Sequence, residues 1–175
     1  MANGDTLYQS WLIKGSYFNR MLDCGHWYNQ WVENALHYLP REILDEHKEN
    51  LVFIAMGHRN GTRLAPEIRE REVIVLSEHV LPKTHANEGQ KEVRYFIYTV
   101  LHEVAHAIRK HDRPDKISQQ EIDAQEKEAD DLALAWFNQH VASRNNPYLP
   151  PLTREEVEEA MQKNREIMEK QYDGV

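Results

Sequence analysis

The chain has 175 residues, a formal net charge of −8 and a single cysteine, Cys24. This length suits one domain with its own hydrophobic core, and the acidic balance argues against nucleic acid as a partner. A lone cysteine excludes an internal disulfide, residues 1–10 lack a signal-peptide pattern, and the longest apolar run (51–56) is too short to cross a bilayer. We therefore expect a cytoplasmic protein with no membrane partner.

Aromatic residues are concentrated in the N-terminal segment 8–48. Trp27 and Trp31 are four residues apart and are followed by Leu36 and Leu39, a spacing typical of one face of a helix. We expect one or two helices here, packed on a catalytic core of about residues 50–142. Together with a C-terminal helix, the whole of 1–175 is expected to form a single domain.

Two short apolar runs predict buried strands. The first is 51–56 (LVFIAM), which Gly57 follows, and the second is 72–76 (EVIVL). Asn60-Gly61 between them predicts a tight turn. The segment 62–68 stays ambiguous, because Pro66 confines it to an edge strand or a loop.

The segment 93–108 carries the most informative pattern of the chain. Its apolar residues recur three and four positions apart, which predicts an amphipathic helix. Within it, His102-Glu103-Val104-Ala105-His106 forms an H-E-x-x-H motif. Histidines four apart lie on one helical face and can bind one ion together, with Glu103 beside it as a general base. This combination is what zinc-assisted hydrolysis requires.

Glu126 is the best candidate for a third ligand. It lies 20 residues after His106, within a second predicted helix over 119–140, so the chain has room to turn and run back past the metal. Asp130 is four residues further on, on the same face, and can accept a hydrogen bond from a ring N–H of His102 or His106.

Several neighbouring residues are alternatives to Glu126. Glu121, Asp123 and Glu128 share its segment, although Glu128 points about 200° away from Glu126 on the helix. Asp112 or His111 would place the third ligand just after the motif helix. That arrangement normally uses a glycine to break the helix, and this chain has Arg109 there instead.

The C-terminal segment 153–171 predicts one more helix. Thr153 and Glu156 form a capping box, and an apolar stripe follows on a highly charged helix. This helix can pack on the body, pack against a second copy or a partner helix, or lie across the cleft.

The H-E-x-x-H and E-x-x-A-D elements over about 73–137 resemble those of gluzincin zinc metallopeptidases, most closely the minigluzincins and the small soluble peptidases of mobile elements that cleave repressors. The resemblance implies one zinc ion per chain, held by His102, His106 and Glu126, with Glu103 as general base. It also implies that Asp130 lies outside the ligands and contacts one of the two histidines. It implies a zincin-like α+β fold: a small twisted, mostly antiparallel sheet packed on the motif helix, a second ligand-bearing helix, and N- and C-terminal helices.

The same resemblance suggests where substrate and transition state are contacted. An edge strand would pair with an extended peptide or protein substrate, which points to Val73, Ile74, Val75 and Leu76, although an internal strand is the alternative. His140 and Tyr148 follow the ligand helix and are candidates to stabilise the oxyanion; Arg144, Tyr95 and Tyr98 are others.

The expected function is peptide-bond hydrolysis by a zinc-activated water. A regulatory or interaction module that keeps the zinc site without turnover is the first alternative. A hydrolase acting on another substrate is the second, because the metal chemistry is not specific to peptides. An intact Glu103 favours chemistry, since a structural zinc site has no use for a general base.

Overall fold

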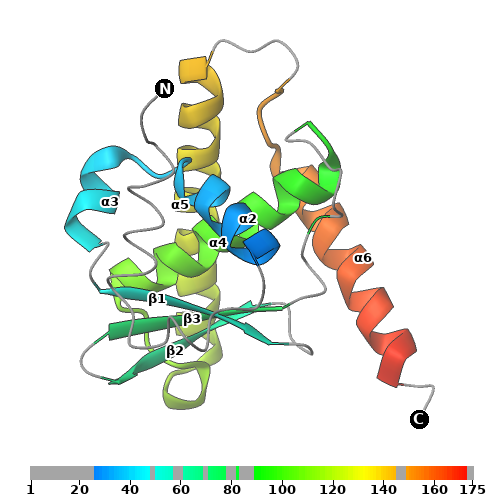
Figure 1. The fold of residues 1–175 in the computed structure, drawn as a ribbon. Coiled ribbons are helices and arrows are strands. Elements are labelled where there is room, and N and C mark those ends of the chain that lie inside the picture. Colours follow the sequence, from blue (N-terminus) through cyan, green and yellow to red (C-terminus); the bar gives the residue numbers. More distant parts are fainter. Residues whose placement is uncertain are drawn as a thin grey trace.

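The computed structural model describes residues 26–47, 50–56, 61–68, 71–77, 82, 89–144 and 149–172. Figure 1 shows the elements along the chain. They are α2 (His26–Leu36), α3 (Arg41–His47), β1 (Leu51–Met56), β2 (Gly61–Ile68), β3 (Arg71–Ser77), α4 (Lys91–Arg109), the short 3₁₀ helix η3 (Pro114–Lys116), α5 (Gln119–Arg144) and α6 (Arg154–Tyr172).

The three strands form one sheet in the order β1-β3-β2. β1 runs parallel to β3, with Leu51 opposite Glu72 and Met56 opposite Ser77. β2 runs antiparallel to β3, and its register shifts between Leu64 and Ile68. Pro66 lies inside this irregularity, where a residue without a backbone N–H interrupts the ladder least. The ambiguous segment 62–68 is therefore part of an outer strand.

The fold class expected from the sequence is wrong. The described residues are mostly helical, and their sheet is a small mixed one with one parallel and one antiparallel pairing, not a mostly antiparallel sheet. The apolar runs identified two of the strands, but apolar patterning does not say which strands pair. β1 pairs directly with β3, and β2 lies between them only in the sequence. This direct pairing is the parallel one in the sheet.

The expected edge strand is the central strand of this sheet. β3 has hydrogen-bonded neighbours on both sides, and Val73, Ile74, Val75 and Leu76 are each at most 2% exposed. A strand covered on both faces has a continuous apolar sequence, which explains the EVIVL run. These four residues therefore belong to the core, and the expectation that they line a substrate-binding edge is wrong.

Helix α4 is the centre of the molecule. It contacts α2, α5, α6, β2 and β3. Its apolar face is fully buried and includes Phe96, Ile97, Val100, Leu101 and Val104. From α2 and the turn after it, Trp31, Leu36 and Leu39 pack into the same core, as their spacing predicted. The motif helix is thereby fixed from several sides.

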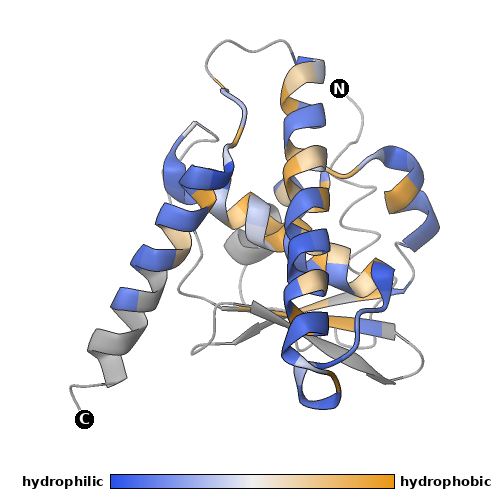
Figure 2. Ribbon diagram, turned by 180° about the vertical axis from the view of Figure 1, so that it is seen from behind, coloured by the Kyte–Doolittle hydropathy of each residue, from blue (hydrophilic) through white to orange (hydrophobic). Residues whose placement is uncertain are grey.

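Helix α5 packs along α4 through small residues. Ala129 and Ala133 are completely buried, and Trp136 and Phe137 extend the contact toward the end of α5. Figure 2 shows the other face of α5 as largely hydrophilic. Alanine side chains let two helices approach closely, so Glu126, one turn before Ala129, is brought up against α4.

Helix α6 is attached to α4 through its first turn. The guanidinium of Arg94, only 4% exposed, donates to Pro151 O at 2.7 Å and to Glu156 Oε2 at 3.1 Å. The predicted capping box is confirmed: Thr153 N donates to Glu156 Oε2, and Glu156 N donates to Thr153 Oγ1. From there α6 runs outward to the C-terminus (Figure 1). Among the helices described, none is both long and apolar enough to cross a membrane.

Candidate metal centre

Three predicted ligands meet where α4 and α5 pack together. His102 Nε2 and His106 Nε2 are 3.0 Å apart. Glu126 reaches both histidines, with Oε2 at 3.3 Å from His102 Nε2 and Oε1 at 3.5 Å from His106 Nε2. Of the residues described, these three form the group that can hold a metal ion.

The spacing of these atoms fits a small tetrahedral cation. Zinc bonds to imidazole nitrogen and carboxylate oxygen are about 2.0–2.2 Å long, which puts tetrahedral ligand atoms about 3.3–3.6 Å apart. The two imidazole nitrogens are 3.0 Å apart, and they lie 3.3 Å and 3.5 Å from different oxygens of Glu126, which is close to that range. Two imidazoles and one carboxylate are also the donor set of an open, three-ligand zinc site. The residues present therefore fit the ion.

The outer nitrogen of His102 faces a carboxylate. His102 Nδ1 lies 2.9 Å from Asp130 Oδ1, and the same oxygen accepts a hydrogen bond from the Tyr98 hydroxyl. Asp130 thus occupies the outer position that the sequence assigned to it, on His102 rather than on His106. This contact has the distance of an ion pair but not the geometry of a hydrogen bond, and it leaves Nε2 directed toward Glu126.

The outer nitrogen of His106 faces a different partner, which the sequence did not indicate. His106 Nδ1 lies 2.9 Å from His111 Nδ1. His111 Nε2 in turn lies 3.2 Å from Glu128 Oε2, and Arg109 Nε lies 2.9 Å from Glu128 Oε1. His111 is buried, with 8% of its surface exposed.

A backbone turn at Lys110 brings His111 back to His106. Lys110 has left-handed dihedrals, φ 55° and ψ 41°, and its N–H donates to Ala107 O while His111 N donates to His106 O. This is a Schellman ending, which usually places glycine at the left-handed position. The helix thus ends without a glycine at position 109, because the next residue, Lys110, adopts the left-handed conformation at a modest energetic cost.

Glu103 completes the site from the same turn of α4. Its side chain is buried, with 9% of its surface exposed, and it lines a cavity of about 270 Å³ together with His102, His106 and Glu126. Burial raises the pKa of Glu103, against the lowering effect of His102 and His106. Tyr95, Ile122 and Met161 also line this cavity, so α6 contributes a side chain to it.

The two carboxylates beside His102 control its protonation. Burial alone lowers the pKa of His102, but Asp130 and Glu126 outweigh burial and raise it to about 10. The contacts with His102 and His106 hold the pKa of Glu126 well below its usual range. Without a cation, this cluster therefore favours the charged form of His102, with a proton on both ring nitrogens.

The alternatives to Glu126 have other contacts. Glu121 accepts from Ser118 N and Ser118 Oγ in a capping box that starts α5, and Asp123 accepts from the Gln119 side chain. Glu128 contacts His111 and Arg109. Asp112 lines the cavity but is outside the three-residue group.

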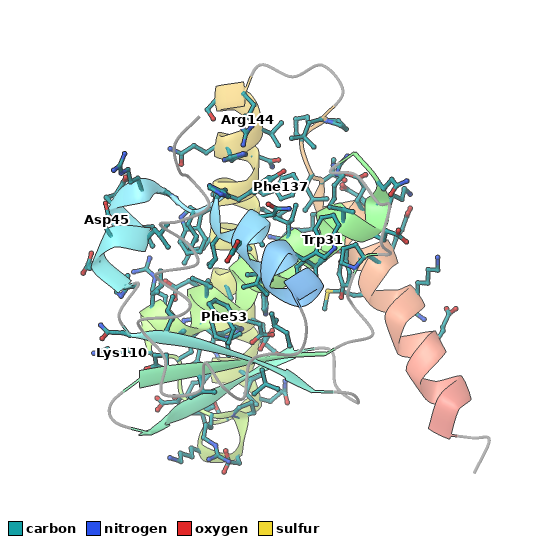
Figure 3. The ribbon with its side chains drawn as sticks, viewed as in Figure 1. Trp31, Asp45, Phe53, Lys110, Phe137 and Arg144 are labelled. Carbon is teal, nitrogen blue, oxygen red and sulfur yellow. The ribbon has the colours of Figure 1, made fainter. Side chains whose placement is uncertain are left out.

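His140 is far from the metal centre. It lies 14 residues after Glu126 on the continuous helix α5, which separates the two by about 21 Å along the axis. Its ring stacks on Tyr38 at 4.0 Å, and its Nε2 accepts from Arg144 Nε. Figure 3 shows Arg144 at the far end of α5. The expectation that His140 is catalytic is therefore wrong. Tyr148, the other candidate, lies outside the described residues.

Comparisons with models of protein families, with curated proteins and with solved structures gave no match. The resemblance to gluzincins therefore depends on the motif residues and Glu126.

Proposed function

We propose that this protein is a zinc-dependent peptidase whose active centre is formed by His102, His106, Glu126 and Glu103. The observation that carries the proposal is that ligand atoms of His102, His106 and Glu126 lie within 4.8 Å of one another, with the buried carboxylate of Glu103 on the same cavity. A site with three protein ligands leaves a coordination position open, as catalytic zinc sites do.

The residues of the chain divide the chemistry between them. A zinc ion, when bound, lowers the pKa of a coordinated water and polarises the substrate carbonyl. Glu103 accepts the proton of the attacking water and returns it to the leaving amine. Its raised pKa suits both steps, because a base whose pKa lies nearer neutrality is also a better acid afterwards.

The cavity walls support a substrate with apolar side chains. Ile122 on α5 and Met161 on α6 present aliphatic side chains, and Tyr95 presents a ring. Peptides offer such side chains beside a hydrolysable carbonyl. The resemblance to gluzincins supports the same substrate class.

The direct test replaces Glu103 by glutamine and measures both zinc content and cleavage of a diverse peptide library. We expect Glu103→Gln to keep zinc, because the ligands remain, and to lose cleavage by a factor of about 10²–10⁴, the usual contribution of a general base. Asp123→Asn, which removes an exposed charge from α5, is the control and should cleave like the wild type. Wild-type protein loaded with zinc that cleaves nothing in the library would contradict the peptidase proposal and favour a zinc-binding module without turnover.

A further inference from the structure

We propose that His111 is a positioning residue for the metal centre: as a neutral imidazole it accepts a hydrogen bond from His106 Nδ1 and keeps His106 Nε2 available to the ion. This inference rests on the proposed metal site. His106 then has an imidazole, His111, beside its outer nitrogen, whereas His102 has the carboxylate of Asp130 there.

The positions of the protons follow from the ligand role of His106. An imidazole that binds an ion through Nε2 must carry its proton on Nδ1. His106 Nδ1 lies 2.9 Å from His111 Nδ1, so the latter must be the acceptor. A neutral His111 then carries its own proton on Nε2, which lies 3.2 Å from Glu128 Oε2 and donates to it.

This direction leaves every donor facing an acceptor. Glu128 accepts from His111 through one oxygen, and its other oxygen forms an ion pair with Arg109 Nε at 2.9 Å. In the reverse direction, His111 Nδ1 would donate to His106 Nδ1. That would place the proton of His106 on Nε2, where it would block the ligand position. The carboxylate of Glu128 therefore selects the tautomer of His106 through His111.

The same geometry argues against His111 as a fourth ligand. Its Nδ1 meets the side of His106 opposite to Nε2, and its Nε2 faces Glu128. Both ring nitrogens are thus engaged away from Glu126. Burial of the His111 side chain keeps water from replacing these contacts.

Zinc affinity of the full-length chain, measured by competition with a chromophoric chelator, tests the role. We expect His111→Leu to weaken zinc binding by about 10- to 100-fold, the usual effect of removing an outer-shell partner. His111→Gln supplies an amide oxygen as acceptor and should recover much of the loss. Glu128→Leu should weaken binding with His111 still in place, whereas Asp123→Leu, on the same helix, should not.

A spectroscopic measurement reports the tautomers directly. In the zinc-loaded protein, ¹⁵N NMR should show His106 protonated at Nδ1 and His111 protonated at Nε2 only. Wild-type zinc affinity in His111→Leu, or His111 protonated on Nδ1, would overturn the inference. Because Glu128 is half exposed, Glu128→Leu provides a second test if His111→Leu does not fold.

The outcomes separate this inference from the proposed function. Tight zinc binding that depends on His111, without peptide cleavage, would refute the peptidase and leave the positioning role intact. Cleavage and zinc binding that are both unaffected by His111→Leu would refute the positioning role alone. A wild-type chain that takes up no zinc would refute both.

Discussion

The residues of the candidate metal centre could be predicted from sequence because a helix fixes their geometry. His102 and His106 are one turn apart, and Glu126 and Asp130 are one turn apart on the next long helix, so two packed helices bring all four together. The role of His111 could not be predicted in this way. It depends on a left-handed turn at Lys110, a residue that gives no local signal for that conformation. The position of His140 was misjudged, although the length of α5 alone places it too far away.

The raised pKa of His102 predicts proton release when zinc binds. In the metal-free protein the folded-state pKa of about 10 exceeds the ordinary value of 6.5, so the stability due to protonated His102 is full below about pH 6.5 and is lost as pH rises through 10. Zinc requires the neutral ring. Binding at pH 7.5 should therefore release about one proton from His102, and apparent affinity should rise up to tenfold per pH unit between 6.5 and 10.

Calorimetry in buffers of different ionisation enthalpy counts these protons. Asp130→Asn removes a partner that raises the pKa of His102, so this variant should release fewer protons at the same pH. Zinc binding to the wild type with no proton released at pH 7.5 would show that His102 is already neutral.

At the scale of elements, the sequence indicated most helices and strands. The strand over 51–56 and the helices over 119–140 and 153–171 occur almost as expected, with α5 four residues longer. The patterns are local, and so are the hydrogen bonds of a helix. The partners of a strand are not local, which is why the order β1-β3-β2 and the central place of β3 were missed.

The end of α4 offers a test of the turn that carries His111. Lys110→Gly removes the Cβ that disfavours left-handed dihedrals, and we expect it to stabilise the protein relative to Lys110→Ala by about 1 kcal/mol. Urea unfolding of the two variants measures the difference, and Lys110→Ala controls for loss of the lysine side chain. A glycine variant no more stable than the alanine variant would mean that residue 110 is not left-handed in solution.

The attachment of α6 depends on a buried arginine. Arg94→Met removes the hydrogen bonds to Pro151 O and Glu156 Oε2, and we expect a loss of about 2 kcal/mol in the free energy of unfolding, typical of hydrogen bonds to charged groups. Hydrogen exchange in α6 should increase. Lys91→Met is the matched control, since Lys91 and Glu159 form an exposed pair that contributes little. Equal effects of the two variants would argue against Arg94 as the anchor.

At the scale of the whole molecule, the fold holds the two helices of the candidate metal centre in fixed register. α4 is covered by α2, α5, α6 and the sheet, and α5 lies on it through completely buried alanines. One helix supplies two histidines and a carboxylate to the candidate site, and the other supplies Glu126 and the outer carboxylates. The sheet positions α4 rather than contributing Val73 or its neighbours to the site.

Zinc content and affinity of the purified wild type, beside Glu126→Ala and Asp112→Ala, test the central claim most directly. We predict about one zinc ion per wild-type chain, lost in Glu126→Ala and kept in Asp112→Ala, because Glu126 contacts both histidines while Asp112 only lines the cavity. A wild-type chain that binds no zinc even when zinc is supplied, or one that loses it with Asp112→Ala and keeps it with Glu126→Ala, would contradict the metal centre described above.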